Sequence, residues 1–380
     1  MSRTFLISAG EVSGDQHAAG LIKAFHQIDS GIDFIGLGGD AVIAEGMRPL
    51  HHVRDLAVTG FVEVIKHLGY FRRVMGETLD LVERRRPDAA ILIDYPGFNL
   101  RLGKRLHALG IPVYYYVSPQ VWAWHRSRVK TMCTFIRHMY VLFPFEAEFY
   151  RESGIPATFA GHPMLDERPP IQDRASFFAE HDLDLQRPLV GLLPGSRRNE
   201  LQHHTLPMIQ AVDELITQRG DLQFVVGAVS SVAPDLYRAF EDHPAICVIE
   251  DAAPPIMQHA DVVITSSGTA TLETALLETP MVVIYRMNAL SYWLGRLLVS
   301  VEHLAMPNLI MDDRIVPELI QGEANGAHIA SWVSDILNDE TLSRSIQQRL
   351  SEVRERLGQP GVSRRVADSI LTDLAGQHGA

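Results

Sequence analysis

The sequence predicts an α/β protein with two doubly wound parallel-sheet domains that face a cleft. Short, continuous apolar runs alternate with amphipathic stretches, which is typical of parallel strands covered by helices on both faces. The chain has 380 residues, too many for one ordinary core. Residues 161–187 are rich in Pro and charge and interrupt the alternation, so they are expected to be an interdomain linker leading into a short helix.

The first half supplies one complete set of elements. The expected strands are residues 4–8, 33–37, 89–94, 113–117 and 138–143, and the expected helices are residues 16–27, 62–85, 100–109 and 146–153. Residues 1–165 should therefore form the first domain.

The second half resumes the same alternation. Its expected strands are residues 189–193, 223–226, 246–249, 261–265 and 281–285. From about residue 325 the pattern is helical to the end. We assign residues 166–325 to the second domain and treat residues 326–380 as separate C-terminal helices.

Composition excludes several classes of protein. Hydrophobic residues make up 46% and charged residues 21%, which is ordinary for a globular protein and argues against disorder. The net charge of -12 makes nucleic acid an unexpected partner. We expect no signal peptide and no spanning segment, hence a cytosolic protein that is at most peripheral to a membrane. The pair of cysteines, Cys133 and Cys247, fits a reducing compartment.

No metal site is expected. The adjacent pairs His51-His52 and His203-His204 lack the one-turn spacing of a zinc-binding helix, and surface or loop positions are the simpler explanation. Dinucleotide binding is also disfavoured, because the segment that begins Gly36-Leu37-Gly38-Gly39 has Ala41 where the fingerprint needs its last glycine.

Two strand-end loops in the second half are suited to one nucleotide diphosphate. Each follows an apolar run and leads into an expected helix, whose N-terminus offers free N–H groups and a positive dipole end to phosphate oxygens. Glycine lets the backbone approach a ligand, and Ser, Thr and Arg side chains add donors. The residues expected to hold the donor are Gly195, Ser196 and Arg197 of the first loop, and Ser267, Gly268, Thr269 and Glu273 of the second. Glu273 is placed to reach a ribose diol.

One such loop alone would be weak support, because a strand–glycine–helix turn is ordinary architecture in α/β domains. The two together, with hydroxyls in both and Arg197 in one, favour a nucleotide-diphosphate donor such as a sugar transferase uses.

Asp94 is the candidate general base. It directly follows the apolar run 89–93, where partial burial would raise its pKa toward a useful range. The alternative is that Asp94 only caps a turn opened by Pro96.

Two further strand-end loops in the first half allow both a functional and a plain interpretation. Residues 10–15 can line the cleft and meet an acceptor, or Ser13 or Asp15 can cap the next helix. Trp122 and Trp124 can stack on a sugar or lipid, or wedge their loop against the core.

Residues 61–75 combine a broad apolar face with basic side chains. Burial against the sheet is the usual explanation, but the composition also suits a helix that meets anionic lipid. The residues predicted to face a membrane are Val64, Leu68, Phe71, Arg72 and Arg73.

Six motifs in order along most of the chain, from residue 6 to about 320, resemble the bacterial lipid-A-disaccharide synthase family. They are Gly10-Glu11-Val12-Ser13-Gly14-Asp15, Ile93-Asp94-Tyr95-Pro96-Gly97-Phe98-Asn99, Ser118-Pro119-Gln120-Val121-Trp122-Ala123-Trp124, Leu193-Pro194-Gly195-Ser196-Arg197, Ser267-Gly268-Thr269-Ala270-Thr271-Leu272-Glu273 and Pro307-Asn308-Leu309. Val12, Tyr95 and Gly97 depart from the residues usual in that family.

The resemblance implies a GT-B glycosyltransferase, with two Rossmann-like domains. It would join UDP-2,3-diacylglucosamine to 2,3-diacylglucosamine 1-phosphate (lipid X) through a β(1→6) bond with inversion, releasing UDP. It needs no cofactor, because the UDP-sugar is a substrate. The family also implies peripheral association with the inner membrane and a homodimer whose C-terminal segments return to the first domain or exchange between subunits.

The residue roles implied by the resemblance agree with the reasoning from the residues. Asp94 carries the base, Arg197 the diphosphate and Asn308 the nucleotide. Glu11, Ser13, Gly14, Asn99 and Trp122 belong to the acceptor side. The alternatives are an enzyme like UDP-GlcNAc 2-epimerase, which needs acid and base groups around the donor sugar, and a non-catalytic UDP-sugar-binding protein.

Overall fold

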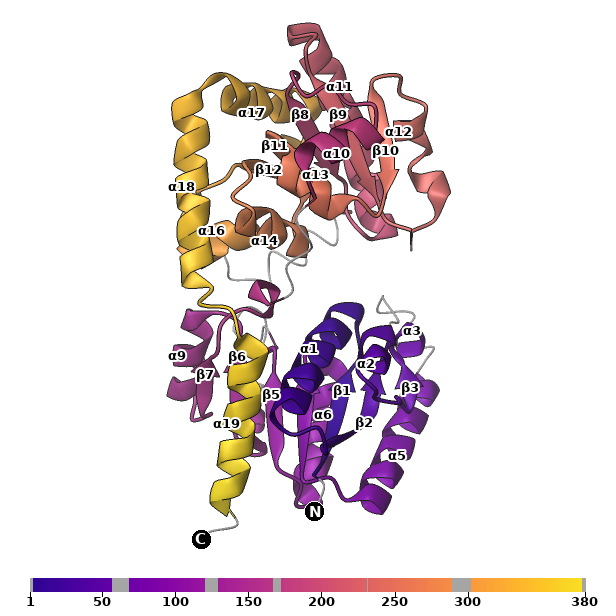
Figure 1. Ribbon diagram of the computed structural model, residues 1–380, viewed down its shortest axis with the longest axis vertical. Helices are drawn as coiled ribbons and strands as arrows, with labels where there is room; N and C mark the ends of the chain where they lie inside the picture. The colour runs from indigo at the N-terminus through magenta and orange to yellow at the C-terminus, as the bar shows by residue number, and fades with distance from the viewer. Residues whose placement is uncertain are drawn as a thin grey trace. The chain divides into compact units, whose positions relative to one another are not determined.

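The computed structural model describes residues 3–56, 68–119, 129–166, 172–230, 232–288 and 302–377. The chain divides into two compact units, shown in Figure 1. The first holds Met1–Arg168 and Leu357–Ala380, and the second holds Pro169–Arg356. Each unit contains one sheet whose recorded strand pairs are parallel, so the predicted α/β architecture of two parallel-sheet domains is confirmed.

In the described part of the first unit, seven strands follow the order β3-β2-β1-β4-β5-β6-β7. They are β1 (Thr4–Ala9), β2 (Asp33–Gly38), β3 (His51–His52), β4 (Ala89–Ile93), β5 (Val113–Tyr116), β6 (Ile136–Val141) and β7 (Ala157–Phe159). The order reverses between β1 and β4, where Ala9 pairs with Ile93. Ligand sites of open α/β sheets gather at such a reversal, and here it brings the loop after Ala9 beside Asp94.

Helices cover both faces of this sheet. They are α1 (Val12–Ile28), α2 (Asp40–Ala44), α3 (Val53–Leu56), α5 (Leu68–Arg85), α6 (Pro96–Ala108), α8 (Val129–Met132), α9 (Pro144–Glu152) and α19 (Val362–Gln377). Alternate residues of each strand point to opposite faces, and both faces of the central strand β4 are buried, so its five residues are all apolar.

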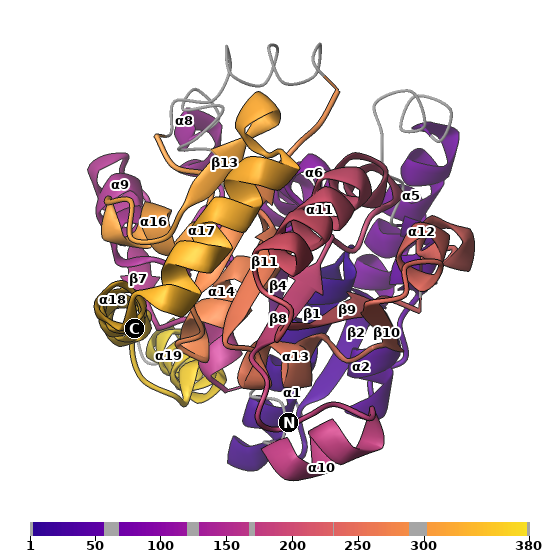
Figure 2. The ribbon, with the colours of Figure 1, turned by 90° about the horizontal axis from the view of Figure 1, so that it is seen from above.

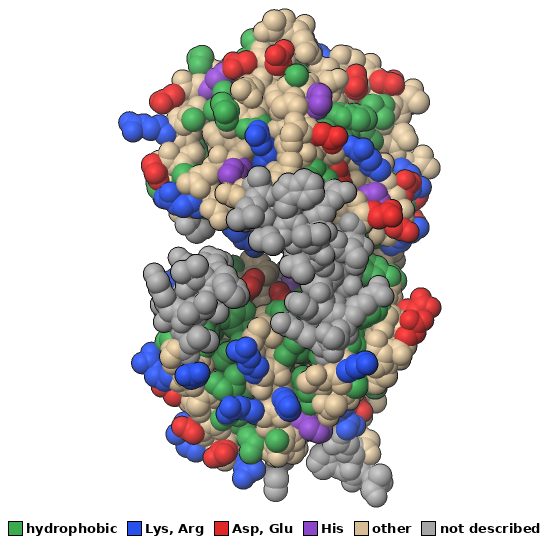
Figure 3. Space-filling model, turned by 180° about the vertical axis from the view of Figure 1, so that it is seen from behind, with side chains coloured by type: hydrophobic (Ala, Val, Ile, Leu, Met, Phe, Trp, Pro, Cys, Tyr) green, Lys and Arg blue, Asp and Glu red, His purple; other side chains and the backbone are tan. Residues whose placement is uncertain are grey.

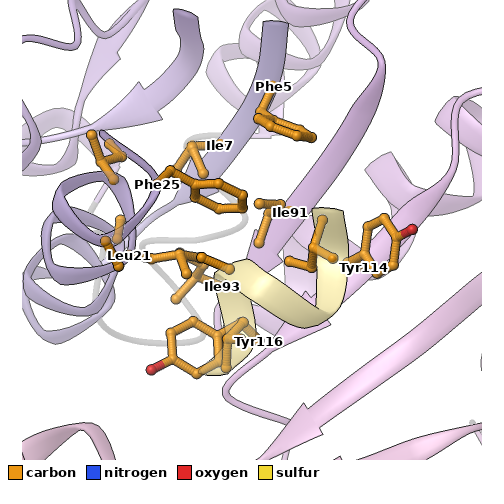
Figure 4. Packing of buried hydrophobic residues seen from close by; sticks show 14 of the residues in the cluster. Phe5, Ile7, Leu21, Phe25, Ile91, Ile93, Tyr114 and Tyr116 are labelled. Atoms are coloured by element: carbon orange, nitrogen blue, oxygen red, sulfur yellow. The ribbon is translucent and has the colours of Figure 1, made fainter. Parts of the chain in front are cut away.

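Two hydrophobic clusters make up the core of the first unit. In one, Leu21 and Phe25 of α1 pack with Ile91 and Ile93 of β4, as Figure 4 shows. The other lies on the opposite face, where α5 and α6 pack with strand residues such as Leu92.

The C-terminal helix α19 completes the first cluster, to which it contributes Val366 and Ile370. Asp373 of α19 pairs with Arg137 of β6 and accepts a 2.5 Å hydrogen bond from the Tyr114 hydroxyl. Removing α19 would therefore expose the apolar interior of a sheet made by residues more than 200 positions earlier.

In the described part of the second unit, six strands follow the order β10-β9-β8-β11-β12-β13. They are β8 (Leu189–Leu193), β9 (Gln223–Ala228), β10 (Ile246–Glu250), β11 (Val262–Ser266), β12 (Met281–Tyr285) and β13 (Glu318–Ile320). The helices are α10 (Arg174–Glu180), α11 (Arg198–Gln218), α12 (Arg238–Glu241), α13 (Ala253–His259), α14 (Thr269–Leu276), α16 (Met306–Met311), α17 (Gly326–Asn338) and α18 (Glu340–Arg356).

We expected residues 326–380 to form a separate set of C-terminal helices, but the boundary between the two units lies at Leu357 instead. Helix α17 packs along α11, as Figures 1 and 2 show, and α18 packs on α14, so both belong to the second unit. Gly326 fits against Gln210 so closely that a Cβ would overlap it. Only the chain from Leu357 onward returns to the first unit.

The ends of several elements differ from the sequence-based expectation. Helix α1 begins at Val12 rather than 16, and α6 begins at Pro96 rather than 100. Strands β3, β7 and β13 have two or three residues each and were not predicted, because such short runs show no periodicity. Across the described residues, no helix is both long and apolar enough to span a bilayer.

Candidate active site

Asp94 and Tyr95 form the turn between β4 and α6. Both have a left-handed backbone, with φ of 43° and 48°. This conformation costs an L-residue on the order of 1–2 kcal/mol. Helix α6 starts at the next residue, Pro96, whose fixed φ suits a first helical turn. Because strained backbone persists only where its surroundings hold it, this turn is a candidate functional site.

A buried network holds the turn. The Asn99 amide nitrogen lies 2.9 Å from the Asp94 carbonyl oxygen and 3.1 Å from the carbonyl oxygens of Ser8 and Ile93. The Asn99 Oδ1 atom accepts from the Ser8 hydroxyl at 2.6 Å, and the Tyr115 hydroxyl donates to the Asp94 carbonyl at 2.5 Å. Asn99 was predicted to lie on the acceptor side. It is fully buried instead, and its side chain belongs to the network that supports Asp94.

The environment of Asp94 suits a base. Burial, together with the smaller effect of the negative charge of Glu11, raises its pKa from 3.8 to about 6. The Tyr95 backbone N–H and the charge of His17 act in the opposite direction. A carboxyl group that titrates near 6 is ionised at neutral pH and is a stronger proton acceptor than an ordinary aspartate.

Glu11 and Ser13 lie exposed at the start of α1, beside the turn that holds Asp94. Gly14 is buried, with its Cα facing the end of β4 at Ile93. Gly10 is required for packing, because a Cβ there would overlap the ring of Tyr95. The structure thus gathers Glu11, Ser13 and Gly14 at the same sheet edge as Asp94, and their contact with an acceptor stays a prediction.

Asp15 has a different role from the predicted helix cap. Its buried carboxylate accepts hydrogen bonds from the backbone N–H groups of Gly39 (2.6 Å), Ala41 (2.9 Å) and Val42 (3.4 Å), so it caps α2. Neither Ser13 nor Asp15 caps α1, whose N-cap is Glu11. A Cβ at Gly39 would overlap Val53 and the Asp15 carboxylate, and a Cβ at Gly38, the last residue of β2, would overlap Val42. The protein's own packing therefore explains this glycine pair without a dinucleotide.

His17 is a site neighbour that the sequence did not reveal. It is buried on α1, and its ring lies edge-on to that of Tyr116, with centroids 6.4 Å apart. It is near enough to Asp94 for its charge to lower the pKa of that carboxyl. His17 lies in the helix predicted over residues 16–27, but a single polar residue on a helix carries no local signal that it faces inward.

The two predicted donor loops lie side by side in the second unit. The strands that precede them, β8 and β11, are hydrogen-bonded neighbours, with Leu193 paired to Thr265. Their carboxyl ends therefore place the loop at Gly195 next to the loop at Gly268. Both glycines have φ that favours glycine, 122° and 148°.

The first loop is organised around Glu200. Its carboxylate accepts from the backbone N–H groups of Ser196 (2.9 Å) and Arg197 (3.2 Å), and the Arg197 guanidinium lies 3.2 Å away. A Cβ at Gly195 would overlap Glu200, so this glycine is needed by the protein's own packing. An acidic residue three positions after the N-cap is a capping-box signal that could have identified Glu200.

The second loop leaves its tip open. Gly268 and Thr269 are exposed at the N-terminus of α14, whereas the Ser267 hydroxyl donates to the Leu304 carbonyl at 2.8 Å. Glu273 is partly buried one turn into α14. Backbone groups of this tip, rather than the Ser267 hydroxyl, are thus presented at the sheet edge.

His204 corrects the expectation of a surface or loop histidine. It is fully buried on α11, and its Nδ1 atom lies 2.8 Å from the Pro194 carbonyl oxygen. Its Nε2 atom accepts from the Arg286 backbone N–H at 3.0 Å, so Nδ1 must carry the proton. His204 therefore fixes the start of the first donor loop, an arrangement that depends on a residue 82 positions away.

Asn308 is fully buried, and protein groups occupy its carboxamide. Its Nδ2 atom donates to the Val316 carbonyl (2.9 Å) and to Glu318 Oε1 (2.7 Å), while Oδ1 accepts from the N–H groups of Ile315 and Val316. The carboxamide has no further donor or acceptor capacity. The predicted contact of this side chain with a nucleotide would require one of these bonds to open.

Glu318 is the buried partner in that cluster. It also accepts from the backbone N–H groups of Leu304 and Ala305, so it fixes the chain that enters α16. A lone acidic residue in a short strand carries no local signal of this role.

The predicted membrane-facing residues are only partly described. Val64, like Trp122 of the acceptor side, lies outside the described residues, and Leu68 is the first residue of α5. Phe71 is partly buried against the core. Arg72 and Arg73 are exposed on the same helix. The described part of this segment thus directs its aromatic side toward the sheet and its basic side outward.

Within the described ranges, no group of three or more His, Cys, Asp or Glu side chains is arranged to hold a metal ion. Cys133 and Cys247 are free.

Solved structures similar to this chain include UDP-sugar enzymes. UDP-GlcNAc 2-epimerase from Neisseria meningitidis, bound to UDP-GlcNAc, has a TM-score of 0.66, with 10% identity over 98% of this chain and 100% of its own. The glycotransferase of kitacinnamycin has a TM-score of 0.63, with 16% identity over 97% and 98%. At these identities the likeness establishes the fold, which is of the GT-B type, and not the reaction.

Sequence relatives are more specific. Lipid-A-disaccharide synthase of Geobacter sulfurreducens is 38% identical over 381 aligned residues, covering 99% of this chain and 98% of the relative. That of Trichlorobacter lovleyi is 40% identical over 370 aligned residues, covering 97% and 96%. The family model described as lipid-A-disaccharide synthetase matches residues 5–371. The chain therefore belongs to the lipid-A-disaccharide synthetase family.

Proposed function

We propose that the protein is an inverting glycosyltransferase of lipid A biosynthesis. It joins UDP-2,3-diacylglucosamine to 2,3-diacylglucosamine 1-phosphate and releases UDP. The family match over residues 5–371 is the observation that carries this proposal. The placement of Asp94 at the sheet reversal and the adjacency of the two donor loops support it.

Asp94 acts as the general base in this reaction. The acceptor 6-hydroxyl oxygen attacks the anomeric carbon of the donor, and the bond from that carbon to the diphosphate oxygen breaks. The hydroxyl proton passes to the Asp94 carboxylate, and the bond electrons leave with UDP. Attack from the face opposite the leaving group inverts the anomeric centre and gives the β(1→6) product.

The donor loops stabilise the leaving diphosphate. The N-terminus of α14 at Gly268 and Thr269 offers backbone N–H groups, and Arg197 offers a guanidinium that is mostly exposed. Glu273, one turn into α14, accepts from the ribose hydroxyls in this proposal. The N-terminus of α14 and Arg197 supply positive charge where negative charge develops, so we propose that the protein requires no cofactor.

The substrates carry long acyl chains, so we propose that the protein works from the cytoplasm while bound peripherally to the inner membrane. Exposed basic residues of α5 and α6 support this, namely Arg72, Arg73, Arg101, Lys104 and Arg105. Figure 3 shows Lys and Arg side chains near apolar ones on the first unit. We also propose a homodimer in which α19 exchanges between subunits, because this helix joins its core cluster from the far end of the chain.

Product analysis with detergent-dispersed lipid substrates tests the reaction. The expected product is a β(1→6)-linked disaccharide 1-phosphate with one UDP per bond. An epimerised UDP-sugar would instead support the epimerase-like alternative, because such an epimerase has a fold similar to that of this chain. Binding of UDP-sugar with no product would support a binding protein.

A further inference from the structure

The main chain of Asp94 is held at both of its polar groups. Its N–H donates to the Tyr116 carbonyl at 3.2 Å, which continues the ladder between β4 and β5. Its carbonyl oxygen leaves the ladder and accepts from Asn99 at 2.9 Å and from the Tyr115 hydroxyl at 2.5 Å. Both lone pairs of this oxygen are therefore used. The backbone leaves the direction of β4 at Asp94, the first of the two residues with a left-handed conformation.

Tyr115 reaches this carbonyl from the neighbouring strand. It pairs in register with Leu92, and its side chain lies on the sheet face covered by α5 and α6. Tyr114 and Tyr116, on either side of it, face the opposite cluster. Tyr115 is fully buried, so its hydroxyl satisfies the Asp94 carbonyl in a place that excludes solvent.

Asn99 is itself locked in one orientation. The Ser8 hydroxyl donates to Oδ1, and carbonyl oxygens of Ser8, Ile93 and Asp94 surround Nδ2. Carbonyls only accept, so the reverse amide orientation would set oxygen against oxygen. The amide thus joins the ends of β1 and β4 to the turn.

We propose that Asn99 and Tyr115 are positioning residues that hold the Asp94–Tyr95 turn in its left-handed conformation and thereby aim the Asp94 carboxylate. This rests on the proposed function for the role of Asp94 as a base, but the hold on the turn itself does not. Neither residue touches the reacting atoms, because both are buried behind the main chain of the turn.

The test is the pair Tyr115→Phe and Tyr114→Phe. Each change removes one hydroxyl from adjacent residues of β5 that face opposite sides of the sheet. The Tyr114 hydroxyl bonds to Asp373 on α19 and serves as the matched control. Tyr115→Phe is expected to lower kcat by about 10- to 100-fold, with both KM values changed by less than about threefold, because the base is misplaced while the substrates still bind. Tyr114→Phe is expected to keep wild-type kcat.

A second measurement does not depend on turnover. The Asp94 carboxyl is followed by ¹³C NMR across pH in the wild type and both variants. In Tyr115→Phe the Asp94 carboxyl should become more exposed to solvent, so the midpoint of its titration should fall toward the ordinary value of 3.8. In Tyr114→Phe the Asp94 carboxyl should titrate as in the wild type. Ser8→Ala, which frees the Asn99 amide, should shift the midpoint in the same direction if Tyr115→Phe folds poorly.

Unchanged kcat and an unchanged Asp94 midpoint in folded Tyr115→Phe would overturn the proposal and leave the hydroxyl a purely structural role. Full turnover in Asp94→Asn would instead refute the base assignment. In that case the NMR midpoint alone would decide whether Asn99 and Tyr115 position the carboxyl.

Discussion

The imidazole of His204 accepts a hydrogen bond of 3.0 Å from the backbone N–H of Arg286. Its other nitrogen bonds to the Pro194 carbonyl, so one neutral ring connects the loop after β8 to the end of β12. Burial lowers the pKa of His204 below its ordinary value of 6.5. The ring therefore keeps the single proton arrangement that both bonds require.

His204→Ala should lower the free energy of unfolding by at least about 1–3 kcal/mol at pH 7.5, because two buried backbone groups lose their partner. The sign of the pH effect follows from the lowered pKa. The unfolded chain binds the proton more readily, so the stability contributed by neutral His204 is present above pH 6.5 and is lost as pH falls. Urea unfolding at pH 7.5 and 5.5 should show a smaller decrease in the free energy of unfolding for the variant than for the wild type. His203→Ala is the control. An equal decrease in all three proteins would contradict the role of His204.

Asp94→Asn should abolish most turnover and at the same time stabilise the protein. Removing a general base typically lowers the rate by about a hundredfold to ten-thousandfold. The folded-state pKa of about 6 lies above 3.8, so folding is opposed by the charged carboxylate at neutral pH and this penalty is relieved below pH 6. The neutral Asn side chain should raise unfolding free energy at pH 7.5 by at most about 3 kcal/mol, and less where solvent reaches the group. A variant with near-normal turnover would rule out the base.

The pH profile of kcat/KM should have an acid limb near pH 6, with activity rising as Asp94 ionises. Two flanking charges should move this limb in opposite directions. Glu11→Gln should move it to lower pH, because the charge of Glu11 raises the pKa of Asp94. His17→Gln should move it to higher pH, because the charge of His17 lowers that pKa. Shifts of the same sign in both variants would show that another group controls the limb.

Arg197→Ala should weaken UDP binding measured by calorimetry, since losing one charge-assisted hydrogen bond typically costs about 1.5–3 kcal/mol. Glu273→Ala should weaken it through the ribose. The exposed neighbour Arg198 supplies the control Arg198→Ala, which should bind UDP like the wild type. Unchanged affinity in both Arg197→Ala and Glu273→Ala would refute the two-loop donor site.

The double variant Arg72→Glu/Arg73→Glu should remain folded, because both side chains are exposed. It should bind anionic vesicles less tightly, at roughly 1 kcal/mol for each basic residue removed, and the difference should shrink as salt screens the surface. Arg84→Glu/Arg85→Glu at the other end of α5 is the matched control. A folded Arg72/Arg73 variant with wild-type vesicle binding would show that docking uses another surface.

Local sequence patterns were sufficient to predict much of the fold and part of the site. Strands such as β4, β8 and β12 are continuous apolar runs because both faces of a parallel sheet are buried. Asp94 could be singled out because it follows such a run. The two donor loops could be paired because each follows a strand, and parallel strands end at one sheet edge.

Only the tertiary structure decided which side chain each polar group meets. The amino-acid order does not show that Asp15 caps α2, that Asn99 lies under the Asp94 turn, or that α19 belongs to the first unit. These contacts join residues from 5 to more than 200 positions apart, and they form only once the sheets have set strand order and register. Buried polar groups must find partners wherever packing brings them, so their roles follow from three-dimensional packing rather than from local pattern.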